Sequence, residues 1–278
     1  ALVLLLCTSS FAAEPGGTLR TVLHRKTLRV GMLPGLVPFV AAGADADELK
    51  RLLGADAPSP ARAVDGRAVC GFDVELAQET ARALGVAVEL TLVDTFDDLL
   101  AGVRDGRFDV VMSAVTRTLE RATTVAFSDP YFASGLLVLV RDPARFPTVE
   151  TLRKPELKVA FRAGTTAQGF AARELAGARL VPLQSDAALY AAMDDPAAAD
   201  AVVVDYVSAR DAEVRGRVKS LLKPVEERRF TTEHFAFVAR QGDPDWVAWL
   251  NLFLRDAKTS GAFHRLAARY NRWFRAER

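Results

Sequence analysis

Short apolar runs of strand length alternate with segments of helical periodicity along most of this chain. The first apolar run is 28–32, and apolar residues then recur at helical spacing over 74–84. Residues 86–92 alternate between apolar and polar side chains, as in a strand with one buried face, and 108–115 is the next apolar strand. This alternation predicts an α/β fold with largely parallel sheets.

The same alternation starts again in the second half of the chain. The strands predicted there are 136–140, 157–162, 179–183 and 201–205. A last strand at 235–239 precedes two amphipathic helices, 244–257 and 262–274. Because no linker of low complexity separates the two units, we expect two lobes joined by ordered crossing strands, with a cleft between them.

Residues 41–69 interrupt this pattern and are rich in Ala, Asp, Gly and Pro. We interpret them as an insertion with one short helix at 47–53, ended by Gly54. The insertion is expected near the mouth of the cleft.

The composition permits a sizeable core and excludes several classes of protein. Half of the 278 residues are hydrophobic, and the net charge of +1 gives no basic surface for nucleic acid. The apolar runs in the body of the chain are too short to cross a bilayer. The three histidines lack the spacing of metal ligands, so we predict neither a metal nor a cofactor.

The N-terminal residues ALVLLLC are followed by small and polar residues. This pattern is typical of a secretory signal whose initial Met and basic segment are missing, so we predict a residual signal peptide at 1–13 and a periplasmic location. The alternative is an apolar tail or a short buried segment. Cys7 follows Leu6 rather than a small residue, so no lipid anchor is expected. Cys70 is then the single thiol of the mature chain, without an internal disulfide.

The stretch 108–131, FDVVMSAVTRTLERATTVAFSDPY, combines a buried strand with a polar turn. Ser113, Thr116 and Arg121 lie at the carboxyl end of this strand, where open α/β sheets bind small ligands. An arginine beside hydroxyls and backbone N–H groups can hold a carboxylate. Asp205 ends another apolar strand and can pair with an amine. A free α-amino acid carries both groups.

These polar residues also have structural alternatives. Arg121 can pair with Glu120 or Asp129 on the surface, where such pairs are common and weak. Asp205 can cap the helix that follows its strand. Asp73 is expected to cap its helix, and capping is also the structural alternative for Thr165 and Thr166.

Several motifs resemble those of one family. Residues 71–77 read GFDVELA, which is similar to a signature of bacterial solute-binding proteins of family 3, the receptors of polar amino acid ABC importers. The run 108–136, the turn 163–166 and the strand 200–205 resemble the same family. This resemblance covers nearly the whole mature chain. It implies a two-lobed periplasmic-binding-protein-like fold of type II, in which each lobe is a mixed sheet flanked by helices.

The resemblance also implies a division of the chain. Lobe 1 would comprise 24–131 and 234–278, with the insertion, and lobe 2 would comprise 136–228. Two hinge strands, 131–135 and 229–233, would join the lobes.

The resemblance further implies a role for each candidate. Arg121 matches the arginine that binds the ligand carboxylate, and Thr116 matches a hydroxyl that shares it. Thr166 matches a residue whose N–H also holds the carboxylate, at the start of a helix. Ala114 matches a position whose carbonyl accepts from the ligand ammonium group, and Asp205 matches the acid that pairs with it. The other expected ligand contacts are Leu36, Ser113, Arg162 and Thr165.

Two positions depart from the family pattern. Many members have an acid where Leu33 stands and an aromatic residue that covers the ligand where Leu36 stands. Because both are aliphatic here, the identity of the ligand stays open, and a more apolar or non-amino-acid ligand is an alternative.

The predicted function is therefore a periplasmic, monomeric receptor that captures an amino acid or similar small zwitterion by hinge closure and delivers it to an ABC permease. The alternative is an enzyme similar to periplasmic cyclohexadienyl dehydratases, which act on prephenate or arogenate. That chemistry needs a general acid, and Glu233, beside His234, is the candidate. A structural hinge role for Glu233 is favoured, because many receptors of the family that the chain resembles have an acid at this position. The sequence also shows no nucleophile elbow, phosphate loop or Cys/His pair.

Overall fold

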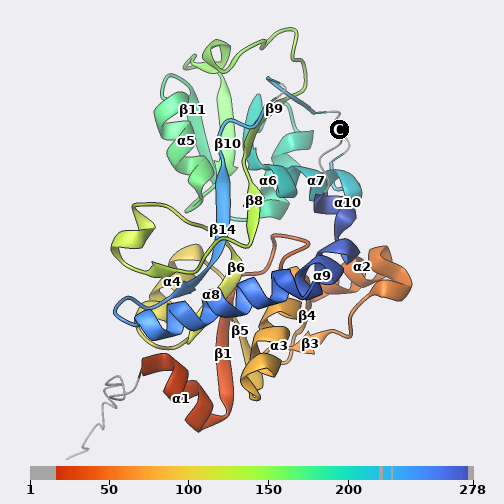
Figure 1. Cartoon of the computed structure of the whole chain (residues 1–278). Helices are drawn as coiled ribbons and strands as arrows, with labels where there is room; N and C mark the ends of the chain where they lie inside the picture. The colour runs from red at the N-terminus through yellow and green to blue at the C-terminus, as the bar shows by residue number, and fades with distance from the viewer. Residues whose placement is uncertain (1–16, 219–221, 227, 275–278) are drawn as a thin grey trace, which may run out of the picture.

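The computed structural model describes residues 17–218, 222–226 and 228–274 (Figure 1), and the predicted signal peptide at 1–13 lies outside them. Figure 1 shows two sheets one above the other, with β8 and β14 between them. We call the elements around the lower sheet the first lobe and those around the upper sheet the second lobe. In the described residues, no helix is long and apolar enough to cross a membrane.

The sheet of the first lobe has the strand order β5-β1-β6-β14-β7, and β8 also pairs with β14. Its strands are β1 (Thr27–Met32), β5 (Ala87–Leu92), β6 (Val110–Thr116), β7 (Ala126–Phe127), β8 (Phe132–Ser134) and β14 (Glu233–Ala239). Strand β1 runs parallel to β5 and β6, whereas β14 is antiparallel to β6. The sheet is therefore mixed, because the late strand β14 returns to it from the second lobe.

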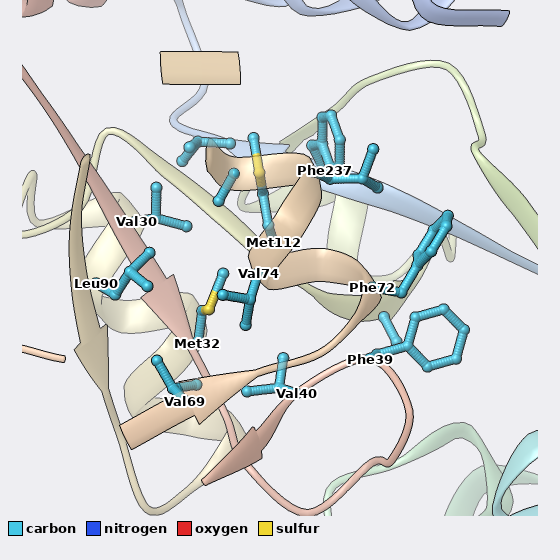
Figure 2. Close-up of a cluster of buried hydrophobic side chains, with 14 of the residues drawn as sticks. Val30, Met32, Phe39, Val40, Val69, Phe72, Val74, Leu90, Met112 and Phe237 are labelled. Carbon is cyan, nitrogen blue, oxygen red and sulfur yellow. The ribbon is translucent and has the colours of Figure 1, made fainter. Parts of the chain in front are cut away.

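Helices cover both faces of this sheet. They are α1 (Gly17–Arg25), α3 (Phe72–Leu84), α4 (Phe96–Arg104), α8 (Pro244–Thr259), α9 (Ala262–Arg269) and α10 (Asn271–Phe274), with the 3-10 turn η2 (Arg121–Thr123) after β6. Alternate residues of β6 face opposite ways: Met112 joins the core with α3 and α8, and Val111 joins the core with α4. Figure 2 shows the first of these cores, where Val74 of α3 lies among Met32, Leu90 and Met112 from the strands.

The second lobe has the strand order β11-β10-β12-β9-β13. Its strands are β9 (Leu136–Val140), β10 (Lys158–Arg162), β11 (Arg179–Leu183), β12 (Ala201–Asp205) and β13 (Lys223–Pro224). Its helices are η3 (Val149–Leu152), α5 (Thr166–Glu174), α6 (Asp186–Asp194) and α7 (Tyr206–Val214). Strand β10 is parallel to β11 and β12, and β9 is antiparallel to β12. The prediction of a mixed α/β fold is confirmed for both lobes.

The insertion forms a small subdomain of its own. It contains β2 (Ala41–Ala42), α2 (Ala44–Leu53), η1 (Gly54–Asp56), β3 (Ala61–Arg62) and β4 (Ala68–Cys70), with the strand order β2-β4-β3. The predicted helix begins at Ala44 rather than at residue 47 and ends before Gly54, whose φ is 62°. None of residues 41–69 lines the main cavity. The insertion therefore contributes no residue to the wall of that cavity, and its expected position near the mouth of the cleft stays a prediction.

Helix α2 instead reaches the second lobe through charged side chains. Asp45 and Glu48 both pair with Arg215, which directly follows α7 and whose side chain is 3% exposed. Arg215 also donates to Asp211 of α7 at 3.1 Å. Arg217, whose side chain is more exposed, also forms ion pairs with Asp45 and Glu48. The insertion is thus tied to the second lobe outside the cleft.

Candidate functional site

A cavity of about 260 Å³ lies between the two lobes. The first lobe contributes the ends of β1 and β6, the start of α4 and the first residue of β14. The second lobe contributes the ends of β10 and β12 and the starts of α5, α6 and α7. Strand ends and helix N-termini therefore meet at one hollow, which is the usual position of a ligand site in open α/β sheets.

Arg121 is the principal cation on the wall from the first lobe. Its guanidinium donates to the Thr116 carbonyl at 2.9 Å and to the Gly164 carbonyl of the second lobe at 3.2 Å. It also stacks over the Phe96 ring, 4.2 Å from the centroid. Burial lowers the pKa of Arg121 to about 10, against the nearby charge of Glu233. Within the described residues Arg121 makes no salt bridge, so the structural alternative of a surface pair with Glu120 or Asp129 is not formed.

Ala114, near the end of β6, has an unusual backbone conformation. Its φ is 47°, which is in the left-handed region that L-residues other than glycine rarely adopt. The pairing of β6 with β14 shifts register at this point. The N–H of Ala114 points into the interior and donates to Asp73 at 2.7 Å. The predicted helix cap at Asp73 is therefore wrong: Gly71 is the N-cap, and Asp73 supports β6.

Ser113 lines the cavity, but its hydroxyl is engaged by the backbone of Leu33. It accepts from the Leu33 N–H at 2.9 Å and donates to the Leu33 carbonyl at 3.2 Å. Ser113 therefore fixes the chain that leaves β1. Leu33 and Leu36 form an aliphatic part of the cavity wall.

Asp205 is the acid at the opposite wall. It caps α7 by accepting from the Val207 N–H at 2.7 Å, and it also accepts from the Ser134 hydroxyl at 2.8 Å. Burial raises the pKa of Asp205 to about 7, although these hydrogen bonds oppose the shift. The capping role is confirmed, and the same carboxylate also lines the cavity.

Arg162 is neutralised inside the second lobe. Its guanidinium donates to Asp186 at 2.9 Å, and both side chains line the cavity. Burial raises the pKa of Asp186, while the charge of Arg162 opposes that rise. Asp186 was not predicted from the sequence, although its position at the start of a helix after β11 is the kind of signal that could have identified it.

Glu233 bridges the lobes within the cavity wall and is only 4% exposed. One of its oxygens accepts from the Thr116 hydroxyl of β6 at 2.6 Å and from the Thr166 hydroxyl of α5 at 2.8 Å. Its other oxygen accepts from Thr231 at 3.2 Å. These contacts correspond to the structural role considered for Glu233. The neighbouring residue His234 is exposed and does not line the cavity.

The two threonines at the start of α5 differ from the expected caps. Thr165 is the N-cap residue, yet its hydroxyl donates back to the Arg162 carbonyl at 2.7 Å instead of capping the helix. Thr166 is the first residue of α5, and its hydroxyl reaches Glu233. The structure brings all nine predicted contacts to one cavity: Leu36, Ser113, Ala114, Thr116, Arg121, Arg162, Thr165, Thr166 and Asp205.

The cavity also contains polar residues that the sequence analysis missed. They are Asp94, Asp97, Gln184, Asp186 and Ser208. Most of them follow a strand or open a helix, as the predicted residues do. Within the described residues, no group of three or more His, Cys, Asp and Glu side chains is placed to hold a metal ion.

Comparisons with known proteins match most of the chain to solute-binding proteins. A model of the bacterial extracellular solute-binding proteins, family 3, matches residues 53–276. A probable histidine-binding protein of Neisseria gonorrhoeae is 31% identical over 221 residues, which are 76% of this chain and 79% of that protein. The crystal structure of the ancestral amino acid-binding protein AncCDT-1, described as a precursor of cyclohexadienyl dehydratase, has a TM-score of 0.75 and 31% identity, covering 93% of this chain and 100% of that one.

A match to an enzyme covers less of the chain. The cyclohexadienyl dehydratase of Pseudomonas aeruginosa is 33% identical over 143 residues, which are 50% of this chain and 52% of that protein. The similarity to binding proteins is therefore the more extensive one.

Proposed function

The chain belongs to the bacterial extracellular solute-binding proteins of family 3, and from that membership we propose that it captures an amino acid between its lobes for an ABC importer. The observation that carries this proposal is the presence of a cation and an acid on opposite walls of one cavity. Arg121 stands on the first lobe and Asp205 on the second, and both line the same cavity. An α-amino acid carries one group for each of them.

The carboxylate of the ligand is assigned to Arg121 and to the backbone N–H groups at the start of α5. A hydroxyl has a single proton, and Thr116 and Thr166 already donate theirs to Glu233. These two hydroxyls therefore bind the ligand carboxylate only if they turn away from Glu233. The N-terminus of α5 adds a favourable backbone dipole for the carboxylate.

The ammonium group is assigned to Asp205 and to the carbonyl of Ala114. A charged hydrogen bond contributes about 1.5–3 kcal/mol once water is excluded. Because Arg121 and Ala114 belong to the first lobe, whereas α5 and Asp205 belong to the second, a bound zwitterion contacts both lobes and stabilises the closed arrangement. Residues 131–135 and 229–233 serve as the hinge in this proposal.

The remaining parts of the proposal follow from the family. The protein acts in the periplasm, reached by way of the signal sequence proposed at residues 1–13, and works as a monomer. Its partner is the permease of the importer, which receives the ligand from the closed form.

A thermal-shift panel of the L-amino acids and L-cystine tests the proposal. Ligands that bind only the folded state stabilise it, by about 2.7 kcal/mol at a concentration of 100 times Kd. We expect a selective rise in Tm with a small subset of the panel. If no amino acid raises Tm while prephenate is consumed, the proposal is overturned in favour of the dehydratase. The dehydratase is the weaker candidate, because its match covers half of the chain and Glu233 is held by three hydroxyls.

A further inference from the structure

Asp73 is a fully buried carboxylate that does not line the cavity. It lies in the first turn of α3, and one of its oxygens accepts from the Ala114 N–H at 2.7 Å and from the Tyr131 hydroxyl at 2.9 Å. Its other oxygen is buried without a hydrogen-bond partner among the described residues. Placing a carboxylate in the interior is costly, so the contact to β6 needs an explanation beyond packing.

The contact coincides with a local distortion of β6. Val111 pairs with Val238 and Val115 pairs with Ala236, so three residues of β6 face one residue of β14. Such bulges commonly redirect the backbone beside a functional site. Ala114 sits inside this bulge at φ 47°, a conformation that costs an alanine about 1–2 kcal/mol. A strained residue of this kind persists only where its surroundings hold it.

Tyr131 strengthens the same support. Its hydroxyl lies 3.2 Å from the Ala114 nitrogen and donates to Asp73. Its ring is buried against Phe72 and Phe237, with centroids 6.2 Å and 5.1 Å away. The Ala114 N–H is therefore held in the interior by two acceptors on separate elements, while Ala114 itself lines the cavity.

We propose that Asp73 is a positioning residue for ammonium recognition: by holding the Ala114 N–H inside, it keeps Ala114 in the left-handed conformation that aims its carbonyl at the ligand amine. This inference rests on the proposed function, because the Ala114 carbonyl has this task only if the ligand carries an α-ammonium group. Asp73 never touches the ligand and acts through the backbone of β6.

The test compares two ligands on several variants. The first is the amino acid that gives the largest thermal shift in the panel, and the second is its analogue with hydrogen in place of the α-amine. Calorimetry gives Kd for each, with the weaker ligand measured by competition. The Kd of the deaminated analogue divided by the Kd of the amino acid reports recognition of the ammonium group alone. Wild-type protein that binds neither ligand refutes the proposed function itself, before Asp73 is tested.

Asp73→Ala is expected to lower this ratio at least tenfold, chiefly by weakening the amino acid, while Kd for the deaminated analogue changes less than threefold. Asp73→Asn keeps an acceptor for the Ala114 N–H and is expected to retain most of the ratio. Adding Ala114→Gly to Asp73→Ala is expected to restore part of it, because glycine adopts a left-handed conformation without strain.

Glu75→Ala is the matched control. Glu75 is another buried acid of α3, but it accepts from Tyr270 at 2.6 Å and lies outside the cavity. This variant is expected to lower Tm without changing the ratio. If Asp73→Ala does not fold, Tyr131→Phe removes one of the two supports of Ala114, and the ratio is expected to fall by a smaller factor. An unchanged ratio in folded Asp73→Ala or in Tyr131→Phe, or an equal loss in Glu75→Ala, overturns the inference.

Discussion

At the residue scale, Arg121 is the side chain on which carboxylate recognition depends most. Its guanidinium already donates to the Thr116 and Gly164 carbonyls, so it is positioned between the lobes before a ligand enters. The lowered pKa of about 10 follows from burial and leaves the group charged at neutral pH. A half-buried cation without a salt bridge among the described residues is available to an incoming anion.

Replacing Arg121 by alanine is expected to weaken binding of the cognate amino acid at least a hundredfold. The loss of two charged hydrogen bonds, at about 1.5–3 kcal/mol each, accounts for this factor. Calorimetry measures Kd, and a thermal melt of the empty protein checks the fold. Arg255→Ala, on an exposed part of α8, is the control and should bind normally. Unchanged affinity in Arg121→Ala would contradict the carboxylate assignment.

The raised pKa of Asp205 predicts that the affinity for the ligand depends on pH. Its pKa is raised to about 7 in the empty protein, chiefly by burial. A bound ammonium group favours the ionised form and lowers that pKa, so binding below pH 7 must release a proton. Affinity is therefore expected to tighten as pH rises from about 5.5 to about 7.5, by up to about tenfold per unit, and then to level off.

Calorimetry in two buffers with different ionisation enthalpies would detect the released proton directly. Asp205→Asn should bind more weakly at pH 8 and lose the pH dependence. A flat profile in the wild-type protein would show that Asp205 does not pair with the ammonium group.

Hydrogen bonds between distant segments limited what the sequence could predict at this scale. Thr116 and Asp205 were identifiable because each ends a strand, and Arg121 because it lies in the polar turn that follows β6; strand ends meet at one edge of a sheet. The engagement of Thr116 by Glu233 joins residues 117 positions apart, and that of Ala114 by Asp73 joins residues 41 positions apart. No local pattern encodes these contacts, so Asp73 was wrongly predicted as a cap.

At the element scale, the insertion shows that composition alone was a poor guide to role. Its helix was predicted correctly, apart from a start three residues too late, because apolar spacing and Gly54 are local signals. The insertion contributes no residue to the cavity wall, and α2 instead directs its acids at Arg215, which directly follows α7. Charge pairing across the two lobes was not visible from the spacing of residues in either segment.

Arg215→Met is expected to lower the free energy of unfolding by about 3–5 kcal/mol, because it leaves the buried carboxylate of Asp211 without its cation. Burial already raises the pKa of Asp211 to about 6, with Arg215 as the main opposing charge. Arg217→Met, at a side chain 40% exposed, is the control and should cost about 0–1 kcal/mol. Urea denaturation measures both. Equal losses of unfolding free energy in the two variants would show that Arg215 contributes no more than a surface ion pair does.

At the scale of the whole molecule, the cavity lies between the two lobes, and hinge closure as proposed would move one lobe relative to the other. Glu233 links Thr116 of the first lobe to Thr166 of the second. A ligand that binds both lobes adds its own bridge and shifts the population towards the closed form. The fold could be predicted at this scale because alternating strands and helices, read with the family motifs, leave few topologies.

Ligand binding is therefore expected to reduce the radius of gyration measured by small-angle X-ray scattering. Arg121→Ala should show no such change at the same ligand concentration, because its ligand no longer joins the lobes. A ligand that binds the wild-type protein tightly without any compaction would argue against hinge closure.

The most direct measurement is a crystal structure of the protein with the amino acid selected by the thermal-shift panel. The ligand is expected to lie between the lobes, with its carboxylate on Arg121 and the N-terminus of α5, and its ammonium group on Asp205 and the Ala114 carbonyl. A ligand bound outside this cavity, or bound with its carboxylate directed at Asp205, would contradict the account.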